Sequence, residues 1–255
     1  MIANYHTHTW RCNHATGREE DYVRTAIDRG FQILGFSDHT PYFFPRDSYS
    51  GIRMRPEQLK DYCDTVRLLR KKYADHIEIP LGLELEYYPK YLPDTLSFLR
   101  DHGIEYLLLG QHFQGNEIGE QYNGRQTQDE NMLRSYCDHS IEAMQTGLFS
   151  YFAHPDLIHY VGDGKLYRQE LRRICREAKS CGLPLELNLL GSWSGRHYPD
   201  RRFWELAAEE GCAVVLGCDA HAPEHLNKPE TEQKLLSLTR ELGLEVLETV
   251  ELRKI

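Results

Sequence analysis

Asn4-Tyr5-His6-Thr7-His8 stands at the end of a short apolar run near the start of the chain, where the first predicted β-strand ends. Alternate residues of an extended strand point to the same side, so the side chains of His6 and His8 can hold one metal ion together. An isolated H-x-H pair is weak evidence for such a site. Its meaning depends on the residues that end the other predicted strands.

Metal-binding residue types recur where the later predicted strands end. His14 follows the first strand, and the other clusters are Ser37-Asp38-His39, Gly82-Leu83-Glu84, Gly110-Gln111-His112, Ala153-His154-Pro155 and Gly217-Cys218-Asp219-Ala220-His221. A lone histidine at a strand end is usually a hydrogen-bonded surface or core residue. The joint occurrence of seven histidines and two carboxylates predicts one rim of ligands that converge on metal ions.

Strand-like and helix-like segments alternate along the chain. Apolar runs predict strands at 2–6, 32–37, 77–84, 105–110, 149–153, 184–189 and 213–217. Helical spacing predicts helices from a Thr16–Glu19 capping box to Gly30, from Pro56 onward, and over about 127–145, 166–181, 200–210 and 229–242. Strands that alternate with helices in this way indicate a parallel sheet with helical crossovers.

The predicted fold class is α/β, with the strands closed into a TIM-like barrel. The carboxyl ends of the strands form the face where such barrels build their active sites. An open doubly wound sheet also binds ligands at that edge, but only at its switch point. Ligands from several strands meet more easily around a closed ring, which favours a seven-stranded barrel. One domain is expected over 1–255, with the irregular segment 41–55 covering one side of the rim.

Composition excludes several classes of protein. The chain has 255 residues, 40% hydrophobic and 27% charged, as in soluble globular proteins. No apolar run is long enough to span a membrane and no signal peptide is apparent, so a cytoplasmic location is expected. The net charge of −9 disfavours nucleic acids and acidic membranes as partners. The sequence gives no indication of the oligomeric state.

The predicted ligands constrain the kind of metal. Seven cysteines without a C-x-x-C pair indicate reduced core thiols rather than disulfides or a thiolate zinc site. Imidazole and carboxylate ligands suit zinc, iron(II) or manganese(II), and the two oxygens of Glu84 can bridge two ions. Asp38 is expected to orient a neighbouring imidazole. Ordinary structural roles are expected for His76, His102, His139, His159 and His225.

These motifs together resemble those of the PHP (polymerase and histidinol phosphatase) family. The landmarks are H-T-H at 6–8, S-D-H at 37–39, G-L-E-L-E at 82–86, G-Q-H-F at 110–113, A-H-P-D-L-I at 153–158, E-L-N at 186–188 and G-C-D-A-H at 217–221. Two further segments are more similar to the histidinol-phosphatase branch than to polymerase-attached or short PHP domains. They are the segment from Arg53-Met54 through Tyr62, and Tyr87-Tyr88-Pro89.

The resemblance implies a distorted (β/α)7 barrel that holds three divalent metal ions. Carried over position by position, the first ion would take His6, His8, Glu84 and Asp219. The second would take Glu84, His112 and His154, and the third would take His14, His39 and His221. The identity of the metal, zinc, iron or manganese, stays open.

The implied activity is hydrolysis of L-histidinol phosphate to L-histidinol and phosphate, a step of histidine biosynthesis. Three dications against two carboxylates would give an acidic protein the positive pocket that a small phosphate monoester needs. The expected chemistry is in-line attack on phosphorus by a metal-bound hydroxide, because a bound cation lowers the pKa of water toward ~7. No residue is singled out as the general acid.

Residues after the sixth predicted strand are candidates for substrate contacts. Arg196 is a candidate phosphate ligand because a guanidinium fork fits phosphate oxygens, although a solvated loop arginine is the alternative. His197 is a second candidate. Glu186 and Asn188 alternate on the strand and either point into the pocket or, for Glu186, form a buried structural carboxylate.

Three other functions stay open at this point. A related phosphatase would act on a nucleotide, a sugar phosphate or phosphotyrosine. An amidohydrolase would also use H-x-H on a barrel, but that class usually lacks a cluster such as His14, His39 and His221. A non-enzymatic module would use the rim as a structural or regulatory metal site.

Overall fold

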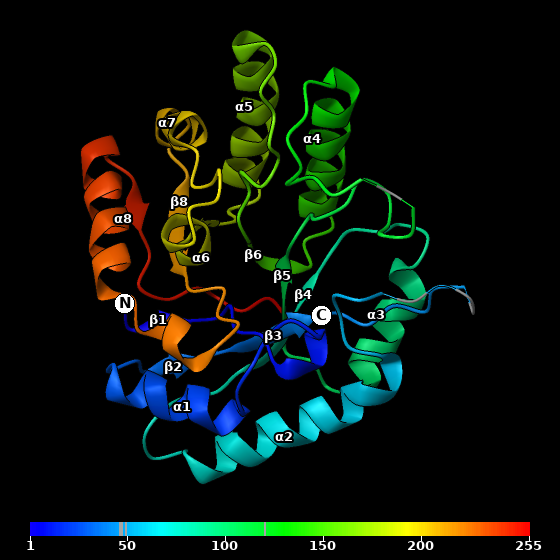
Figure 1. The fold of residues 1–255 in the computed structure, drawn as a ribbon, viewed down its shortest axis with the longest axis vertical. Helices are drawn as coiled ribbons and strands as arrows, with labels where there is room; N and C mark the ends of the chain where they lie inside the picture. The colour runs from blue at the N-terminus through cyan, green and yellow to red at the C-terminus, as the bar shows by residue number, and fades with distance from the viewer. Residues whose placement is uncertain (46–47, 49, 120) are drawn as a thin grey trace.

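Strands and helices alternate along the protein in a computed structural model that describes residues 1–45, 48, 50–119 and 121–255. Figure 1 shows the helices arranged around the strands. The strands are β1 (Ala3–Asn4), β2 (Ile33–Leu34), β3 (Phe36–His39), β4 (Leu81–Leu85), β5 (Tyr106–Leu109), β6 (Phe149–Phe152), β7 (Leu185–Asn188), β8 (Ala213–Gly217) and β9 (Glu245–Val246). The main helices are α1 (Glu19–Asp28), α2 (Leu59–Lys72), α3 (Leu92–Asp101), α4 (Glu130–Gln145), α5 (Gly164–Ser180), α6 (Leu189–Trp193), α7 (Arg201–Glu209) and α8 (Pro229–Leu242). Short 3-10 helices are η1 (Trp10–Cys12), η2 (Pro56–Gln58) and η3 (Pro223–Leu226).

The sheet is parallel throughout, which confirms the predicted α/β class. Seven strands follow one another in the order β3-β4-β5-β6-β7-β8-β9, and β1 pairs separately with β2. Beyond β1, the chain lies between β3 and the residues that follow β8. The Ser37 N–H donates to the Thr7 carbonyl at 2.9 Å, and the His8 N–H donates to the Ala220 carbonyl at 2.9 Å.

The seven strands of the sheet are not the seven that the sequence predicts. The predicted strand 32–37 divides into β2 and β3 at Gly35, and β9 is an additional strand. The Tyr106 hydroxyl occupies the space beside Gly35, where a Cβ would lie 2.3 Å from it. That hydroxyl donates to the carbonyls of Tyr5 and Phe36 at 2.8 and 3.1 Å. The strand is therefore interrupted at a contact with a core side chain and not at a turn that the local sequence would predict.

Side chains on the strands alternate between two hydrophobic clusters, as the pleat requires. On β5, Leu107 and Leu109 belong to the large cluster beneath the helices, whereas Tyr106 and Leu108 belong to a smaller one. The smaller cluster also includes Val250 from the C-terminal segment. The two clusters fix the strands from both faces.

The helices follow the predicted ranges with two corrections. The Thr16–Glu19 capping box is wrong, because α1 begins at Glu19 with Arg18 as its N-cap. Gly17 has a φ of +87° and turns the chain there, and the Thr16 N–H donates to the His221 carbonyl at 2.8 Å. Helices α3 and α6 were not predicted. None of the helices in the described ranges is both long and apolar enough to cross a membrane.

Candidate metal centre

All nine predicted metal ligands lie near the carboxyl ends of the strands. Each follows or ends its strand as predicted: His6 and His8 after β1, His39 on β3, Glu84 on β4, His112 after β5, His154 after β6, and Asp219 and His221 after β8. His14 follows η1. Overlapping groups of three or more of these residues have donor atoms within 4.8 Å of one another. The structure therefore brings together residues that are up to 215 positions apart in the chain, from His6 to His221.

Glu84 is the centre of this arrangement and is fully buried. Its Oε2 atom lies 3.5 Å from His6 Nε2, 3.6 Å from His8 Nε2 and 3.1 Å from His39 Nδ1. A Cβ on residue 110 would lie 2.1 Å from Glu84 Oε1, so Gly110, directly after β5, leaves the room that this carboxylate needs.

The other oxygen of Glu84 faces a different pair of imidazoles. Its Oε1 atom lies 3.0 Å from His154 Nε2 and 3.5 Å from His112 Nε2. Each carboxylate oxygen therefore has its own group of nitrogen donors. This division suits a carboxylate that bridges two cations.

Asp219 supplies the second buried carboxylate. Its Oδ1 atom lies 3.5 Å from His6 Nε2 and 3.2 Å from His8 Nε2. Asp219 and His154 have φ values of +50° and +35°, which residues other than glycine rarely adopt. Backbone strain of this kind concentrates at functional sites.

His14, His39 and His221 form a third group at the outer side of the centre. The Nε2 atoms of His14 and His221 lie 3.0 Å apart. Their Nδ1 atoms lie 2.7 Å from the Cys12 carbonyl and 3.0 Å from the Asp219 carbonyl, respectively. The backbone thus orients both rings so that the Nε2 atoms face each other.

Two carboxylates, Glu186 and Glu86, contact ligand imidazoles from behind at hydrogen-bond distance, and a third, Asp38, lies near His8 without a hydrogen bond to it. His6 Nδ1 lies 2.8 Å from Glu186 Oε1, His112 Nδ1 lies 2.8 Å from Glu86 Oε1, and His8 Nδ1 lies 3.5 Å from Asp38 Oδ1. Such partners set the tautomer and orientation of a metal-binding imidazole. Asp38 and Glu186 were candidates from the sequence.

Glu86 was missed, although the sequence contains a signal for it. It alternates with Glu84 in G-L-E-L-E at 82–86 and therefore points to the same side of the strand.

Glu186 receives a second contact, from the His154 N–H at 3.1 Å, and this contact holds the loop after β6 in place. Glu186 is therefore a buried carboxylate behind the centre and does not line the cavity.

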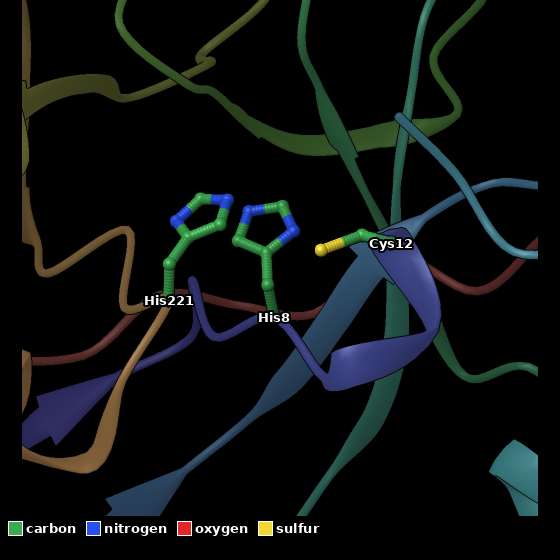
Figure 2. A group of neighbouring side chains, drawn as sticks. All are labelled: His8, Cys12 and His221. Carbon is green, nitrogen blue, oxygen red and sulfur yellow. The ribbon is translucent and has the colours of Figure 1, made fainter. Parts of the chain in front are cut away.

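One thiol also reaches the centre. Figure 2 shows Cys12 on η1 with its sulfur directed toward His8, whose ring stacks on that of His221. The ring centroids of the two histidines lie 4.0 Å apart. Cys12 is completely buried, as predicted for a core thiol, but its sulfur lies within 4.8 Å of a ring nitrogen of each histidine.

Buried polar atoms without a hydrogen-bond partner gather in the centre. They include Nε2 of His6, both ring nitrogens of His8, Nδ1 of His39 and Oε2 of Glu84. A buried polar atom without a partner destabilises a fold by about 1–3 kcal/mol, so their concentration at one point requires an explanation. Their lone pairs and the carboxylate charge are the donor set that divalent cations prefer. The residues therefore fit metal ions.

The electrostatics of the centre agree with this assignment. Burial raises the pKa of Glu84, but the imidazoles of His112, His39 and His6 outweigh it and hold that pKa well below its usual range. Burial lowers the pKa of His6, but the carboxylates of Glu186, Asp219 and Glu84 raise it well above its ordinary value. Both shifts show that the carboxylates of the centre are ionised and favour positive charge close by.

A cavity of about 430 Å³ opens above the centre. Ile52, Phe113, Tyr122, Arg196, Tyr198 and His225 line it together with His14, His39, Glu84, His112, His154, Leu190, Asp219 and His221. Arg196 is thus in the predicted place, and its Nη1 donates to the Tyr198 hydroxyl at 2.6 Å. Ile52 shows that segment 41–55 reaches the rim, although residues 46, 47 and 49 of that segment lie outside the described residues.

The structure does not bring His197 to the cavity lining. Its Nε2 atom lies 2.7 Å from the Leu157 carbonyl, and its ring stacks on that of His159 at 4.0 Å. His225 is at the cavity instead, where its Nδ1 accepts from the His221 N–H at 3.1 Å. A polar loop is predicted at His225, and no sequence pattern indicates the 3-10 helix η3 that contains it.

Comparison with known proteins shows which family this chain resembles. The family model for the PHP domain matches residues 4–189. A Deinococcus radiodurans protein named "Probable histidinol-phosphatase" is 30% identical over 87% of this chain and 87% of its own length. A Schizosaccharomyces pombe protein of the same name is 28% identical over 89% of this chain and 82% of its own length.

A solved structure has the same fold. The histidinol phosphate phosphatase of Lactococcus lactis, in complex with zinc, L-histidinol and phosphate, superposes with a TM-score of 0.76. It covers 98% of this chain and 97% of its own, at 20% sequence identity. The resemblance seen in the motifs is confirmed: this chain belongs to the PHP domain family.

Proposed function

We propose that this protein is a histidinol-phosphatase, a metal-dependent phosphoric monoester hydrolase that converts L-histidinol phosphate to L-histidinol and phosphate. The observation that carries the proposal is the cluster of unpartnered nitrogen and oxygen atoms around Glu84 beneath an open cavity. The names of its two relatives support the substrate. The Lactococcus lactis enzyme, which holds zinc, L-histidinol and phosphate, supports it further.

Three divalent ions are proposed, held by the nine residues at the carboxyl ends of the strands. The geometry supports three groups: His6, His8, Glu84 and Asp219; Glu84, His112 and His154; and His14, His39 and His221. When bound, ions of this kind activate water and neutralise the charge of a transferring phosphoryl group. Zinc, iron and manganese all suit the donor set.

The protein's own side chains would bind and orient the substrate. Arg196 lies at the cavity with its Nη1 on the Tyr198 hydroxyl, so the rest of its guanidinium fork can meet phosphate oxygens. Phe113 and Tyr122 supply apolar and aromatic surface beside it. These two residues are suitably placed to contact the imidazole ring or the carbon chain of L-histidinol phosphate.

The proposal also includes a closed, distorted (β/α)7 barrel formed by one domain over 1–255. The hydrogen bonds of Thr7 and His8 to Ser37 and Ala220 support closure, because they join the first strand of the series to the end of β8. A closed ring accounts for ligands that come from six strand ends and meet at Glu84.

A substrate panel tests the proposed function. Phosphate release is measured with metal-loaded protein on L-histidinol phosphate, a nucleotide, a sugar phosphate and phosphotyrosine, with amide substrates as a check for amidohydrolase activity. The expected result is the highest kcat/KM for L-histidinol phosphate and no amide hydrolysis. A far higher kcat/KM for another ester, or turnover of amides alone, would contradict the proposal.

A further inference from the structure

Arg53 is a fully enclosed arginine whose side chain joins three parts of the molecule. Its Nη1 donates to the Thr40 carbonyl at 2.7 Å, and its Nη2 donates to Glu86 Oε1 at 2.9 Å. Its Nε and Nη2 also donate to the two oxygens of Glu117, at 2.8 and 2.9 Å. Only 2% of the Arg53 side chain is exposed, so water does not replace any of these contacts.

The first connection leads to the metal centre. Glu86 Oε1, which accepts from Arg53, is the same oxygen that lies 2.8 Å from His112 Nδ1. His112 Nε2, on the other side of the ring, faces Glu84 at 3.5 Å. Arg53 is therefore one residue removed from a proposed ligand, and the guanidinium fixes the carboxylate that fixes the imidazole.

The second connection leads to the cavity wall. Arg53 follows Ile52 in the segment after β3, and Glu117 lies in the segment after β5 that begins with His112 and Phe113. Ile52 and Phe113 both line the cavity. The Arg53–Glu117 ion pair therefore ties together two loops that both contribute to the cavity wall.

We infer that Arg53 is a positioning residue that couples the two cavity loops to the orientation of His112; this inference rests on the proposed function. The fork of a guanidinium is needed, because four acceptor atoms on Thr40, Glu86 and Glu117 surround it in fixed directions. A lysine ammonium is a point charge and does not reproduce that geometry. Arg53→Lys should therefore behave nearly as badly as Arg53→Met.

Arg70 offers a control at the opposite end of the strands, because it also forms a bidentate ion pair and donates to a backbone carbonyl. Its Nη1 and Nη2 atoms donate to the two oxygens of Glu105 at 2.8 and 2.6 Å, and its Nε donates to the Ile79 carbonyl at 2.7 Å. Arg70 shares one carboxylate fork and one carbonyl with Arg53, but it lacks a contact like that of Arg53 with Glu86, and 36% of its side chain is exposed. Arg70 is remote from the cavity lining, so Arg70→Met reports on the loss of a structural arginine alone.

The test is a titration of metal-free protein with Zn²⁺, followed by steady-state kinetics on L-histidinol phosphate. Arg53→Met and Arg53→Lys are expected to lose about 10-fold in affinity for one zinc ion, the lower end of the effect of removing a ligand's direct partner, because Arg53 acts through Glu86. Arg70→Met should bind zinc as the wild-type protein does. Equal zinc binding in folded Arg53→Met and wild type, or an equal loss in Arg70→Met, would overturn the inference.

Two milder variants keep the inference testable where Arg53→Met does not fold. Glu86→Gln should weaken zinc binding, whereas Glu117→Gln should leave zinc binding intact and raise KM, because only the loop contact is removed. Unchanged zinc affinity in Glu86→Gln together with unchanged KM in Glu117→Gln would refute the coupling. Wild-type protein that binds none of zinc, iron and manganese would instead refute the proposed function, so the two failures are distinguishable.

Discussion

The two ends of the same strands differ in whether their polar side chains have hydrogen-bond partners. At the amino end, the Tyr106 hydroxyl donates to two backbone carbonyls and Glu105 receives both arms of Arg70. At the carboxyl end, imidazole nitrogens and an oxygen of Glu84 are buried without hydrogen-bond partners. The hydrogen-bonded polar groups at the amino end maintain the fold. The unpartnered atoms at the carboxyl end mark the place where cations are expected.

The same substitution at the two ends gives the largest contrast. Glu84→Gln removes the charge shared by two proposed ions, so kcat/KM should fall by at least about 1000-fold, or ~4 kcal/mol of transition-state stabilisation. Glu105→Gln at the amino end should leave kcat/KM unchanged. Phosphate release from L-histidinol phosphate measures both. Comparable activity in the two variants would remove the functional distinction between the ends.

Removing a carboxylate behind the centre should have a smaller effect. Glu186→Gln keeps the shape of the side chain that contacts His6 Nδ1 but weakens its hold on the imidazole. A fall of about 10- to 100-fold in kcat/KM or in zinc affinity is expected, measured by kinetics and by zinc titration. If neither quantity changes, Glu186 is only a structural carboxylate.

The cavity arginine should have a still smaller effect. Arg196→Lys retains the charge but loses the fork, so the affinity for phosphate should fall by about tenfold, or ~1.4 kcal/mol. Competitive inhibition by inorganic phosphate measures that affinity without turnover. An unchanged inhibition constant would return Arg196 to the alternative role of a solvated loop residue.

At the amino end, the effect should be on stability alone. Tyr106→Phe keeps the ring but removes a hydroxyl that two buried carbonyls share, so the free energy of unfolding should fall by about 1–3 kcal/mol. Chemical denaturation measures this loss, and kcat/KM should stay at the wild-type value. A large loss of activity at unchanged stability would show that the two ends are not separable.

The sequence predicts the positions of the proposed ligands well, because the information is local. Residues in H-x-H, G-L-E and D-A-H lie where apolar runs end. In a parallel sheet, the carboxyl ends of all strands lie at the same edge. The same alternation contained Glu86, two residues after Glu84. Strand ends and their alternation therefore predict which side chains gather.

Contacts between distant segments are not encoded in this local way. The break at Gly35 depends on Tyr106, and the partner of His6 is 180 residues away at Glu186. His225 lines the cavity and His197 does not, the reverse of the expected positions, because of loop conformations that no periodicity describes. The short β9 pairs through two residues, too few for a recognisable pattern.

Metal analysis of the purified protein tests the central claim most directly, namely that the unpartnered atoms around Glu84 exist to hold cations. Wild-type protein dialysed against metal-free buffer after loading should retain about three ions per chain, and Glu84→Gln should retain fewer while its circular dichroism stays native. Chelation should abolish phosphate release, and returned metal should restore it. Wild-type protein that retains no divalent metal, or that keeps its full activity after complete chelation, would contradict the account.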